Sequence, residues 1–337
     1  MIRVLSEADV GQAISMPDGV RLVEEAVRQY AEGEVTLLPR VGLNLPGNGG
    51  AFRVMAASMP GIGAFGLKTL TGYPGKRVLG ETYFVILLFS AENGALRAVM
   101  AAGHLTGIRT GAATGVAAKY LARENAKVLG VFGAGVQAKQ QVAAMVAVRP
   151  ITRIKIFDLD RPKAEALARY AREKFGVLAD VPANAQEVVA GSDLVVTATT
   201  GREPVFCGEW LEEGTHVSGV GANTPAKREL DALTFQRSKI VVDFKEQALE
   251  EGGDLREALK SGAIGPSDVY ADLGEIVTGR KAGRTSDREI TLFKSVGIAV
   301  EDIAAAAYVF EQAELRGLGT AMEFDGAGLT LQNGRII

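Results

Sequence analysis

The sequence contains few of the residues that build disulfide-rich or metal-binding proteins. Its one cysteine, Cys207, excludes an intrachain disulfide and a cysteine-rich metal site. A histidine-based zinc site or a Ser/His/Asp triad would have to use His104 or His216, and no nucleophile elbow accompanies either. We expect His216 to lie in the core of a strand and His104 to make local hydrogen bonds. No metal cofactor is predicted.

Long apolar runs and a large excess of one charge are also missing. No run of about 18 apolar residues occurs, and the N-terminus lacks a basic segment followed by an apolar one. The net charge of -3 provides no basic surface for nucleic acid or an anionic membrane. We therefore predict a cytoplasmic enzyme. Its 337 residues exceed the size at which one core usually keeps growing, so two domains are expected.

Glycine is abundant, and one glycine-rich stretch organises the chain. The apolar run 128–132 predicts a strand buried on both faces, and it leads directly into Gly133-Ala134-Gly135. A turn this tight needs residues without a Cβ. Gly135 also lets the backbone approach a pyrophosphate at the N-terminus of the next helix, and Ala138 is the small third residue of the fingerprint.

A second strand followed by an acid completes this pattern. Residues 154–157 predict the strand, and Asp158 follows it. A carboxylate there accepts hydrogen bonds from the adenosine ribose hydroxyls and repels a 2′-phosphate, which favours NAD over NADP. Arg161 could soften that preference. The alternative is a structural α/β turn that binds no nucleotide.

The region before the glycine turn has a different pattern. A capping box at Ser6 and Asp9 predicts a first helix, and Pro17 is expected to begin a second. Four strand-like runs then follow with connections too short for crossover helices, which predicts a largely antiparallel sheet. These runs are 51–58, 65–71, 83–89 and 96–101.

The last long helix, ending at Arg316, is expected to pack back on this first sheet. The fold class is therefore α/β, with a Rossmann-type doubly wound parallel sheet and a discontinuous α+β domain. We expect residues 1–122 plus 299–337 to form the substrate-binding domain. Residues 123–298 would form the NAD-binding domain.

Several cations stand at unusual positions. Lys68 lies between apolar neighbours in a strand, where an ammonium is costly to desolvate and needs an anionic partner. The alternative is a lysine that snorkels to water. Arg40 and Arg53 are weaker candidates. Arg109 and Thr110 are expected in the first turn of a helix, whose N-terminus favours an anion.

Further parallel strands are predicted at 193–199, 215–220 and 240–243. Ligands of open parallel sheets bind outside the carboxyl ends of the strands. The segment 246–284 is acidic and punctuated by glycine, we expect it to be helical, and it indicates no chemistry. The strand-end rule nominates residues 133–136, Asp158, residues 197–200, residues 221–223 and Asp243.

Six motifs stand in order along the chain: LLPR (37–40), GLK (66–68), IRTGAAT (108–114), GAGVQA (133–138), VGANTPAKREL (220–230) and LFKSVG (292–297). Together they resemble the ornithine cyclodeaminase/mu-crystallin family over nearly the whole chain. The resemblance implies a homodimer, in which the first domain's sheet completes a barrel with its partner. It also implies an NAD(P) domain that faces a substrate cleft.

The resemblance further implies roles for individual residues. Arg40, Lys68 and Arg109 match positions that hold the substrate carboxylate, and the lysine also assists proton transfer. Arg53 is added as a substrate contact, and residues 295–297 match a segment that closes over nicotinamide and substrate. The predicted cofactor contacts are Thr82, Arg109, Thr110, Gly133, Gly135, Val136, Gln137, Asp158, Thr197, Ala198, Thr199, Val220, Gly221, Ser295, Val296 and Gly297.

Two positions depart from the cyclodeaminase pattern. Asn223 replaces an aspartate acid/base, and an asparagine cannot exchange a proton near neutral pH. Arg53 replaces a glutamate that receives the ornithine amine, and an arginine would repel that amine. Both changes speak against a lyase, and Arg53 resembles the alanine dehydrogenase branch more closely, although members of that branch can have the aspartate.

The predicted reaction is NADH-dependent reduction of an imino acid to an amino acid, with Lys68 and Asn223 as catalytic residues. The substrate would be a ketimine, a cyclic imine, or an imine formed from a 2-oxo acid and an amine. Alanine dehydrogenase-like activity is included, and NADP is the less favoured cofactor. The alternatives are an ornithine cyclodeaminase-type lyase with recycled NAD and a nonenzymatic binding protein.

Overall fold

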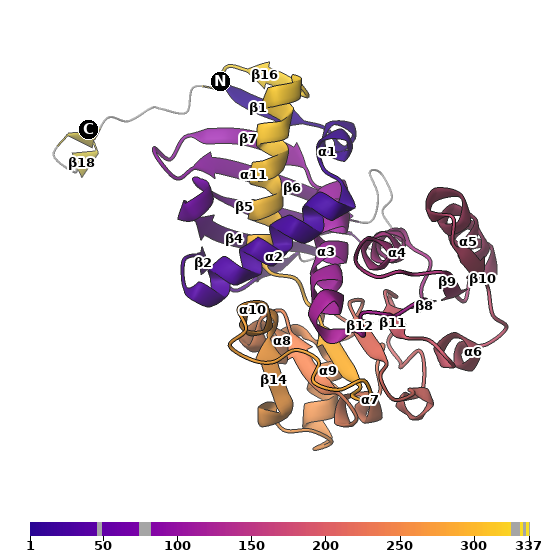
Figure 1. Ribbon diagram of the computed structural model, residues 1–337. Helices are drawn as coiled ribbons and strands as arrows, with labels where there is room; N and C mark the ends of the chain where they lie inside the picture. The colour runs from indigo at the N-terminus through magenta and orange to yellow at the C-terminus, as the bar shows by residue number, and fades with distance from the viewer. Residues whose placement is uncertain (46–48, 74–81, 325–330, 333–334, 337) are drawn as a thin grey trace.

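The computed structural model describes residues 1–45, 49–73, 82–324, 331–332 and 335–336. Two large sheets lie in two parts of the molecule, each with its own helices (Figure 1). Among these residues we find no helix whose length and apolar character would let it cross a membrane. The loops expected to shape the substrate pocket, 44–50 and 72–80, fall partly outside the described residues.

The first sheet has the strand order β16-β1-β7-β6-β5-β4-β2, with β3 beside β4. Its pairs are antiparallel except for β1 with β7, which confirms the predicted character of this sheet. The four predicted strands are all present, as β4 to β7. The strands are β1 (Ile2–Leu5), β2 (Thr36–Leu37), β3 (Val41–Leu45), β4 (Gly50–Met59), β5 (Ala64–Gly72), β6 (Thr82–Ser90), β7 (Leu96–Ala101) and β16 (Thr320–Met322).

Four helices cover one face of this sheet (Figure 1). The capping box of Ser6 with Asp9 opens the first of them, as predicted, and a second box of Ser15 with Asp18 opens the next. The last long helix crosses β4, β5 and β6, so the end of the chain does return to the first sheet. The helices are α1 (Glu7–Ala13), α2 (Met16–Glu32), α3 (Gly103–Leu121) and α11 (Ala299–Arg316).

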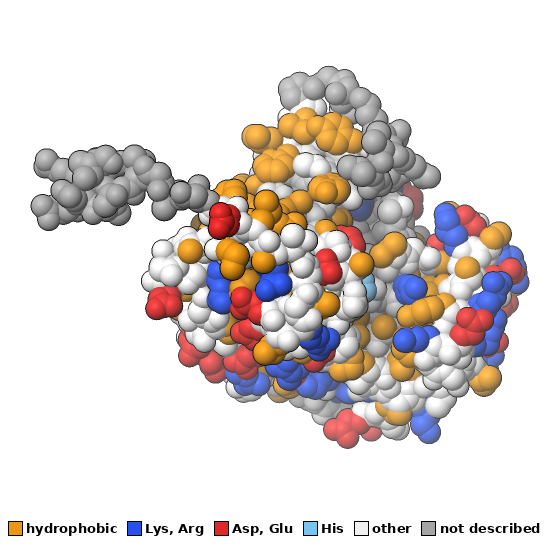
Figure 2. All heavy atoms as spheres, turned by 90° about the horizontal axis from the view of Figure 1, so that it is seen from above, with side chains coloured by type: hydrophobic (Ala, Val, Ile, Leu, Met, Phe, Trp, Pro, Cys, Tyr) orange, Lys and Arg blue, Asp and Glu red, His pale blue; other side chains and the backbone are white. Residues whose placement is uncertain are grey.

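The opposite face of the sheet carries a row of half-buried apolar side chains. Phe65 and Phe89 stack across β5 and β6 with ring centroids 5.2 Å apart, and Leu67 lies opposite Leu87. No described helix covers this face. Figure 2 looks down on the β16 end of the molecule and shows hydrophobic side chains gathered over the part that contains the first sheet. A large uncovered apolar face indicates an interaction surface.

The second sheet is parallel throughout, in the order β10-β9-β8-β11-β12-β15-β13-β14. The strand order reverses at β8, the strand that leads into the glycine turn, as in a doubly wound fold. The predicted fold class is confirmed. The strands are β8 (Val128–Phe132), β9 (Arg153–Phe157), β10 (Leu178–Asp180), β11 (Leu194–Thr197), β12 (His216–Gly219), β13 (Lys239–Val242), β14 (Val269–Asp272) and β15 (Thr291–Lys294).

Helices pack on this sheet and link its strands. Residues 246–284 contain helices, as predicted, but they also contain β14. Two carboxylates of this segment, which was expected to carry no chemistry, pair with Arg40 and Lys294. Two of the four residues of β14, an alanine and an aspartate, are of types depleted in strands, so the sequence pattern did not mark it. The helices are α4 (Val136–Val148), α5 (Arg161–Phe175), α6 (Ala185–Val189), α7 (Ala232–Gln236), α8 (Lys245–Glu251), α9 (Gly253–Lys260) and α10 (Leu273–Val277).

Candidate active site

Lys68 lies on the helix-covered face of β5 and is 1% exposed. Its Nζ donates to Oδ1 of Asp302 on α11 at 2.7 Å, and this carboxylate is also fully buried. The predicted anionic partner therefore exists, and the alternative of a lysine that reaches water is wrong. Burying an ammonium is tolerated here because a carboxylate lies directly against it.

Arg109 lies close to the same carboxylate. Its Nε is 3.0 Å from Asp302, and its Nη1 donates to Glu301 at 2.6 Å. Two acids at the start of α11 thus neutralise Lys68 and Arg109 together. Sequence reasoning missed both acids, although a charged pair within the otherwise apolar run IAVEDIAAAA was a usable signal.

The expected place of Arg109 in the first helical turn is wrong. Helix α3 begins at Gly103, so Arg109 and Thr110 lie in its second turn. The amides at the helix N-terminus, of Gly103 and His104, each donate to the Glu7 carboxylate at 2.7 Å. A side chain from a distant part of the sequence fills the anion site that was expected to bind substrate.

Arg40 reaches the same region from the start of the first sheet. Its guanidinium contacts Glu251 at 2.8 Å and donates to the carbonyl of Val296 at 2.7 Å. Gly297 has a φ of +82°, and a Cβ there would lie 2.5 Å from Nη1 of Arg109. The segment after β15 therefore lies directly against both arginines, and glycine is required at 297.

Asp243, at the end of β13, holds this segment in place. Its Oδ2 accepts hydrogen bonds from the Ser295 hydroxyl at 3.1 Å and from the amides of Val296 at 2.7 Å and Gly297 at 2.5 Å. The side chain is 1% exposed. The rule that ligands bind at strand ends nominated Asp243. In the structure its carboxylate fixes residues 295–297 against Arg40 and Arg109.

The burial of these charges changes their proton affinities. Burial and the charge of Arg109 lower the pKa of Lys68, Asp302 opposes both, and the net value is about 7. Burial raises the pKa of Glu301 to about 7, against the opposing effect of Arg109. Burial would lower the pKa of Arg109, but Asp302 and Glu301 outweigh it and raise the value. Lys68 can therefore give or take a proton near neutral pH.

The glycine turn after β8 is shaped for a close ligand. Gly133 has a φ of +96°, and a Cβ there would lie 2.6 Å from the carbonyl oxygen of Ala198. A Cβ on Gly135 would meet nothing within 4 Å, so the space above the turn is open. Beside it Val136 is exposed, and Oε1 of Gln137 is buried with no partner in the described chain. These features fit a pyrophosphate at the N-terminus of α4.

Asp158 lies at this turn, as predicted. Its carboxylate accepts hydrogen bonds from the amides of Ala134 and Asp160, each at 2.8 Å. Helix α3 lies beside α4, and a Cβ on Gly111 would be 2.8 Å from the carbonyl oxygen of Gln140. The glycines of α3 thus bring the helix that carries Arg109 against the helix that begins at the turn.

Within the described residues, Arg53, Thr82 and Thr110 form no hydrogen bond or ion pair with Lys68, the Arg109 side chain or their acids. Arg53 is half-buried on β4 and donates to the Leu43 carbonyl and to Oδ1 of Asn44. Thr82 is exposed at the start of β6, and Thr110 donates its hydroxyl to the carbonyl of Thr106 in its own helix. Their roles stay predictions.

The loops after β11 and β12 carry the remaining predicted contacts. Residues 197–199 and 220–221 follow these two neighbouring strands. Asn223 lies in the second loop, with its Oδ1 3.4 Å from Nζ of Lys227. A buried acid that the sequence did not reveal, Glu229, binds both loops.

Other features of the molecule lie apart from this cluster. His216 is fully buried within β12, as predicted, and its ring nitrogens contact the hydroxyls of Thr291 and Ser218.

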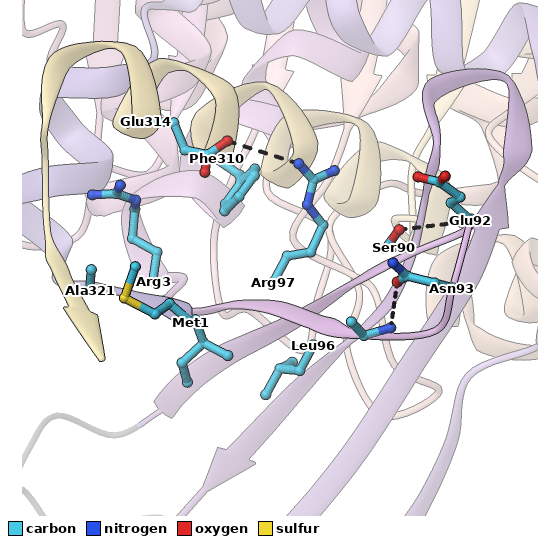
Figure 3. A pocket seen from close by; sticks show the side chains of 12 residues that line it. Met1, Arg3, Ser90, Glu92, Asn93, Leu96, Arg97, Phe310, Glu314 and Ala321 are labelled. Carbon is cyan, nitrogen blue, oxygen red and sulfur yellow. Dashed lines mark hydrogen bonds and ion pairs between the residues drawn. The ribbon is translucent and has the colours of Figure 1, made fainter. Parts of the chain in front are cut away.

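A hollow of about 370 Å³ lies at the far edge of the first sheet (Figure 3). There Arg97 stacks on Phe310 and pairs with Glu314 at 3.9 Å. No predicted site residue lines this hollow.

Comparison with known proteins extends these observations. The chain is 40% identical to the alanine dehydrogenase of Archaeoglobus fulgidus over 95% of this chain and 98% of that protein. The structure is similar to that of Thermococcus litoralis Delta(1)-pyrroline-2-carboxylate reductase in complex with NADH and L-proline. Their TM-score is 0.92, with 38% identity over 95% of this chain and all of that one.

A dimeric archaeal alanine dehydrogenase with bound NAD is also similar. Its TM-score is 0.91, with 40% identity over 96% of this chain and 99% of that one. The sequence profile of the ornithine cyclodeaminase/mu-crystallin family matches residues 2–317, which is nearly the whole described chain. This protein therefore belongs to the ornithine cyclodeaminase/mu-crystallin family.

Proposed function

We propose that this protein is an NAD(H)-dependent oxidoreductase that reduces an imino acid to an amino acid, with alanine dehydrogenase-like activity included. The observation that carries the proposal is the buried Lys68, which shares the Asp302 carboxylate with Arg109. The charge of Arg109 also lowers the pKa of Lys68. The loop 295–297 joins this group to the parallel sheet. A cluster of cations held by acids, with a proton available on Lys68, suits a substrate that carries a carboxylate and a basic nitrogen.

The open glycine turn, the N-terminus of α4 and Asp158 would hold the cofactor, which favours NAD over NADP. The loops 197–199, 220–221 and 295–297, with Thr82, Arg109 and Thr110, complete the proposed contacts. When bound, NADH would supply the hydride that reduces the imine carbon. The relatives support this assignment, because one was solved with NADH and L-proline and another with NAD.

The chain's own residues would prepare the substrate for that transfer. Arg109 and Arg40 bind the substrate carboxylate, with Arg53 as a further contact, and orient the C=N group. Lys68 gives its proton to the imine nitrogen, which makes the imine carbon more electrophilic and leaves a neutral lysine amine. Asn223 orients the nitrogen or a water, since an amide cannot exchange a proton near neutral pH.

The assembly is part of the same proposal. A dimeric relative and the uncovered apolar face of the first sheet support a homodimer. The separate sheets support a division into 1–122 plus 299–337 and 123–298 as the two domains. A cytoplasmic location and the absence of nucleic-acid and membrane partners stay predictions from the sequence.

The test is oxidation of NADH, and separately of NADPH, with cyclic imino acids, ketimines, and pyruvate or glyoxylate plus an amine. We expect turnover with at least one imine, and a loss of about 10²- to 10⁴-fold in Lys68→Ala. Lys155→Ala, on β9 of the other sheet, is the control and should keep full activity. Full turnover in Lys68→Ala or Arg109→Ala would contradict the site. Ammonia release from ornithine without net NADH change would indicate a lyase instead.

A further inference from the structure

The carboxyl ends of β11 and β12 lie side by side, with Thr197 opposite Gly219 in the ladder. The two loops that leave them, 197–199 and 220–223, carry proposed contacts to cofactor and imine. They are packed very closely, because a Cβ on Gly221 would lie 2.2 Å from the carbonyl oxygen of Thr199. A side chain at 221 would therefore push the loops apart.

A single carboxylate joins the two loops. Glu229 is 0% exposed, and four donors converge on it. From the first loop it accepts hydrogen bonds from the Thr197 hydroxyl at 2.9 Å and the Thr199 amide at 2.5 Å. From the second it accepts hydrogen bonds from the amides of Gly221 at 2.6 Å and Ala222 at 3.1 Å. Neither loop could shift without breaking bonds to this carboxylate.

Burial raises the pKa of the Glu229 carboxyl, and the charge of Lys294 and the hydrogen bonds from Thr199 oppose that rise. In the part of the chain that the structure describes, no lysine or arginine forms an ion pair with it. Lys294 itself is fully buried and lies 3.1 Å from Asp254. A glutamine would fit the space, but its NH₂ group would face N–H donors instead of accepting from them.

We propose that Glu229 is a positioning residue that fixes the loops 197–199 and 220–222 as one unit and so sets the cofactor-binding surface between them. This rests on the proposed function, because the loops are assigned to the cofactor there. Glu229 touches neither cofactor nor imine and acts through Thr199, Gly221 and, beyond them, Asn223.

The test is Glu229→Gln in the full-length protein, with the milder Glu229→Asp in case the first variant folds poorly. NADH affinity is measured by fluorescence titration, and we expect the Kd to rise about tenfold or more. Amide hydrogen exchange without cofactor is measured in parallel. Exchange should accelerate in both loops together, because the bonds to one carboxylate restrain both.

Asp193→Asn is the matched control. Asp193 accepts hydrogen bonds from the amides of Lys127 and Val128 at the opposite, amino end of the sheet. We expect it to lower the melting temperature while leaving the NADH Kd and the exchange of both loops unchanged.

Unchanged exchange in both loops, or acceleration in one loop alone, would overturn the positioning role. So would an NADH Kd equal to that of the control variant. If the wild-type protein binds NADH and yet reduces no imine, the proposed function fails while the exchange and affinity results still decide the role of Glu229.

Discussion

Lys68 has neighbours that change its proton affinity in opposite directions. Its own burial and the charge of Arg109 favour the neutral amine, whereas Asp302 favours the ammonium, and the resulting pKa is about 7. An ordinary lysine would hold its proton too tightly to give it up at neutral pH. The site thus obtains an acid suited to an imine without using a histidine.

The reduction rate should follow this titration. The ammonium is the donor, so kcat/KM for a neutral imine should be constant below about pH 7 and fall about tenfold per pH unit above it. A pH profile measures this. An N-methylated iminium acid needs no proton and provides the control, since its profile should lack the fall. An equal fall with both substrates would show that another group is titrating.

Asp302 is the partner that makes a buried Lys68 tolerable. Asp302→Asn leaves the buried ammonium of Lys68 without its counter-ion, and the Arg109 guanidinium keeps only Glu301. We expect a loss of about 3–5 kcal/mol in the free energy of unfolding, measured with urea. Asp180→Asn removes a half-exposed partner of Arg153 and should cost only about 0–1 kcal/mol. Equal losses of unfolding free energy in the two variants would mean that the buried ion pair stabilises the fold no more than the exposed one.

At the scale of elements, α3 connects the two sheets and is capped at both ends from elsewhere in the chain. Glu7 accepts from its first amides, and Arg149 donates to the carbonyls of Ala118, Lys119 and Ala122 at its end. These contacts satisfy groups that a helix leaves unpaired at its ends. They also fix the axial position of the helix, and therefore the position of Arg109.

Removing the N-terminal contact should weaken the fold without changing the chemistry. We expect Glu7→Ala to lower the free energy of unfolding by about 1–2 kcal/mol, as for loss of a helix cap, because two amides lose their acceptor. Thermal and urea unfolding measure this, and kcat should stay within about twofold. Glu34→Ala, an exposed acid beyond the end of α2, is the control. A large loss of kcat would mean that Glu7 belongs to the site.

At the scale of the whole molecule, the apolar outer face of the first sheet should bind a second copy. Leu87 lies in the middle strand of this face, opposite Leu67. Burying a carboxylate there would be costly, so Leu87→Glu should convert a dimer into a monomer. Light scattering after size exclusion measures the mass. Leu159→Glu, at a 96% exposed position in the other part of the molecule, should remain dimeric. A dimeric Leu87→Glu would place the interface elsewhere.

Much of this protein can be predicted from local sequence. The glycine turn, Asp158 after the second strand, the antiparallel runs and the buried Lys68 all appear as predicted. Strand period, turn chemistry and a cation among apolar residues are properties of a few neighbouring residues, so the sequence shows them directly.

The partners of those residues were settled only by the tertiary structure. Lys68 and its partner Asp302 are 234 residues apart in the sequence, and Arg109 and Glu301 are 192 apart. At the N-terminus of α3, where an anion was expected, the amide of Gly103 donates to Glu7, which is 96 residues away in the sequence. Glu251 stands in no motif, and although Glu229 lies within VGANTPAKREL, that motif does not show which loops its carboxylate binds. A buried charge must be neutralised by whatever group the fold brings beside it. The sequence therefore determined which residues are unusual, and the long-range path of the chain decided what each one contacts.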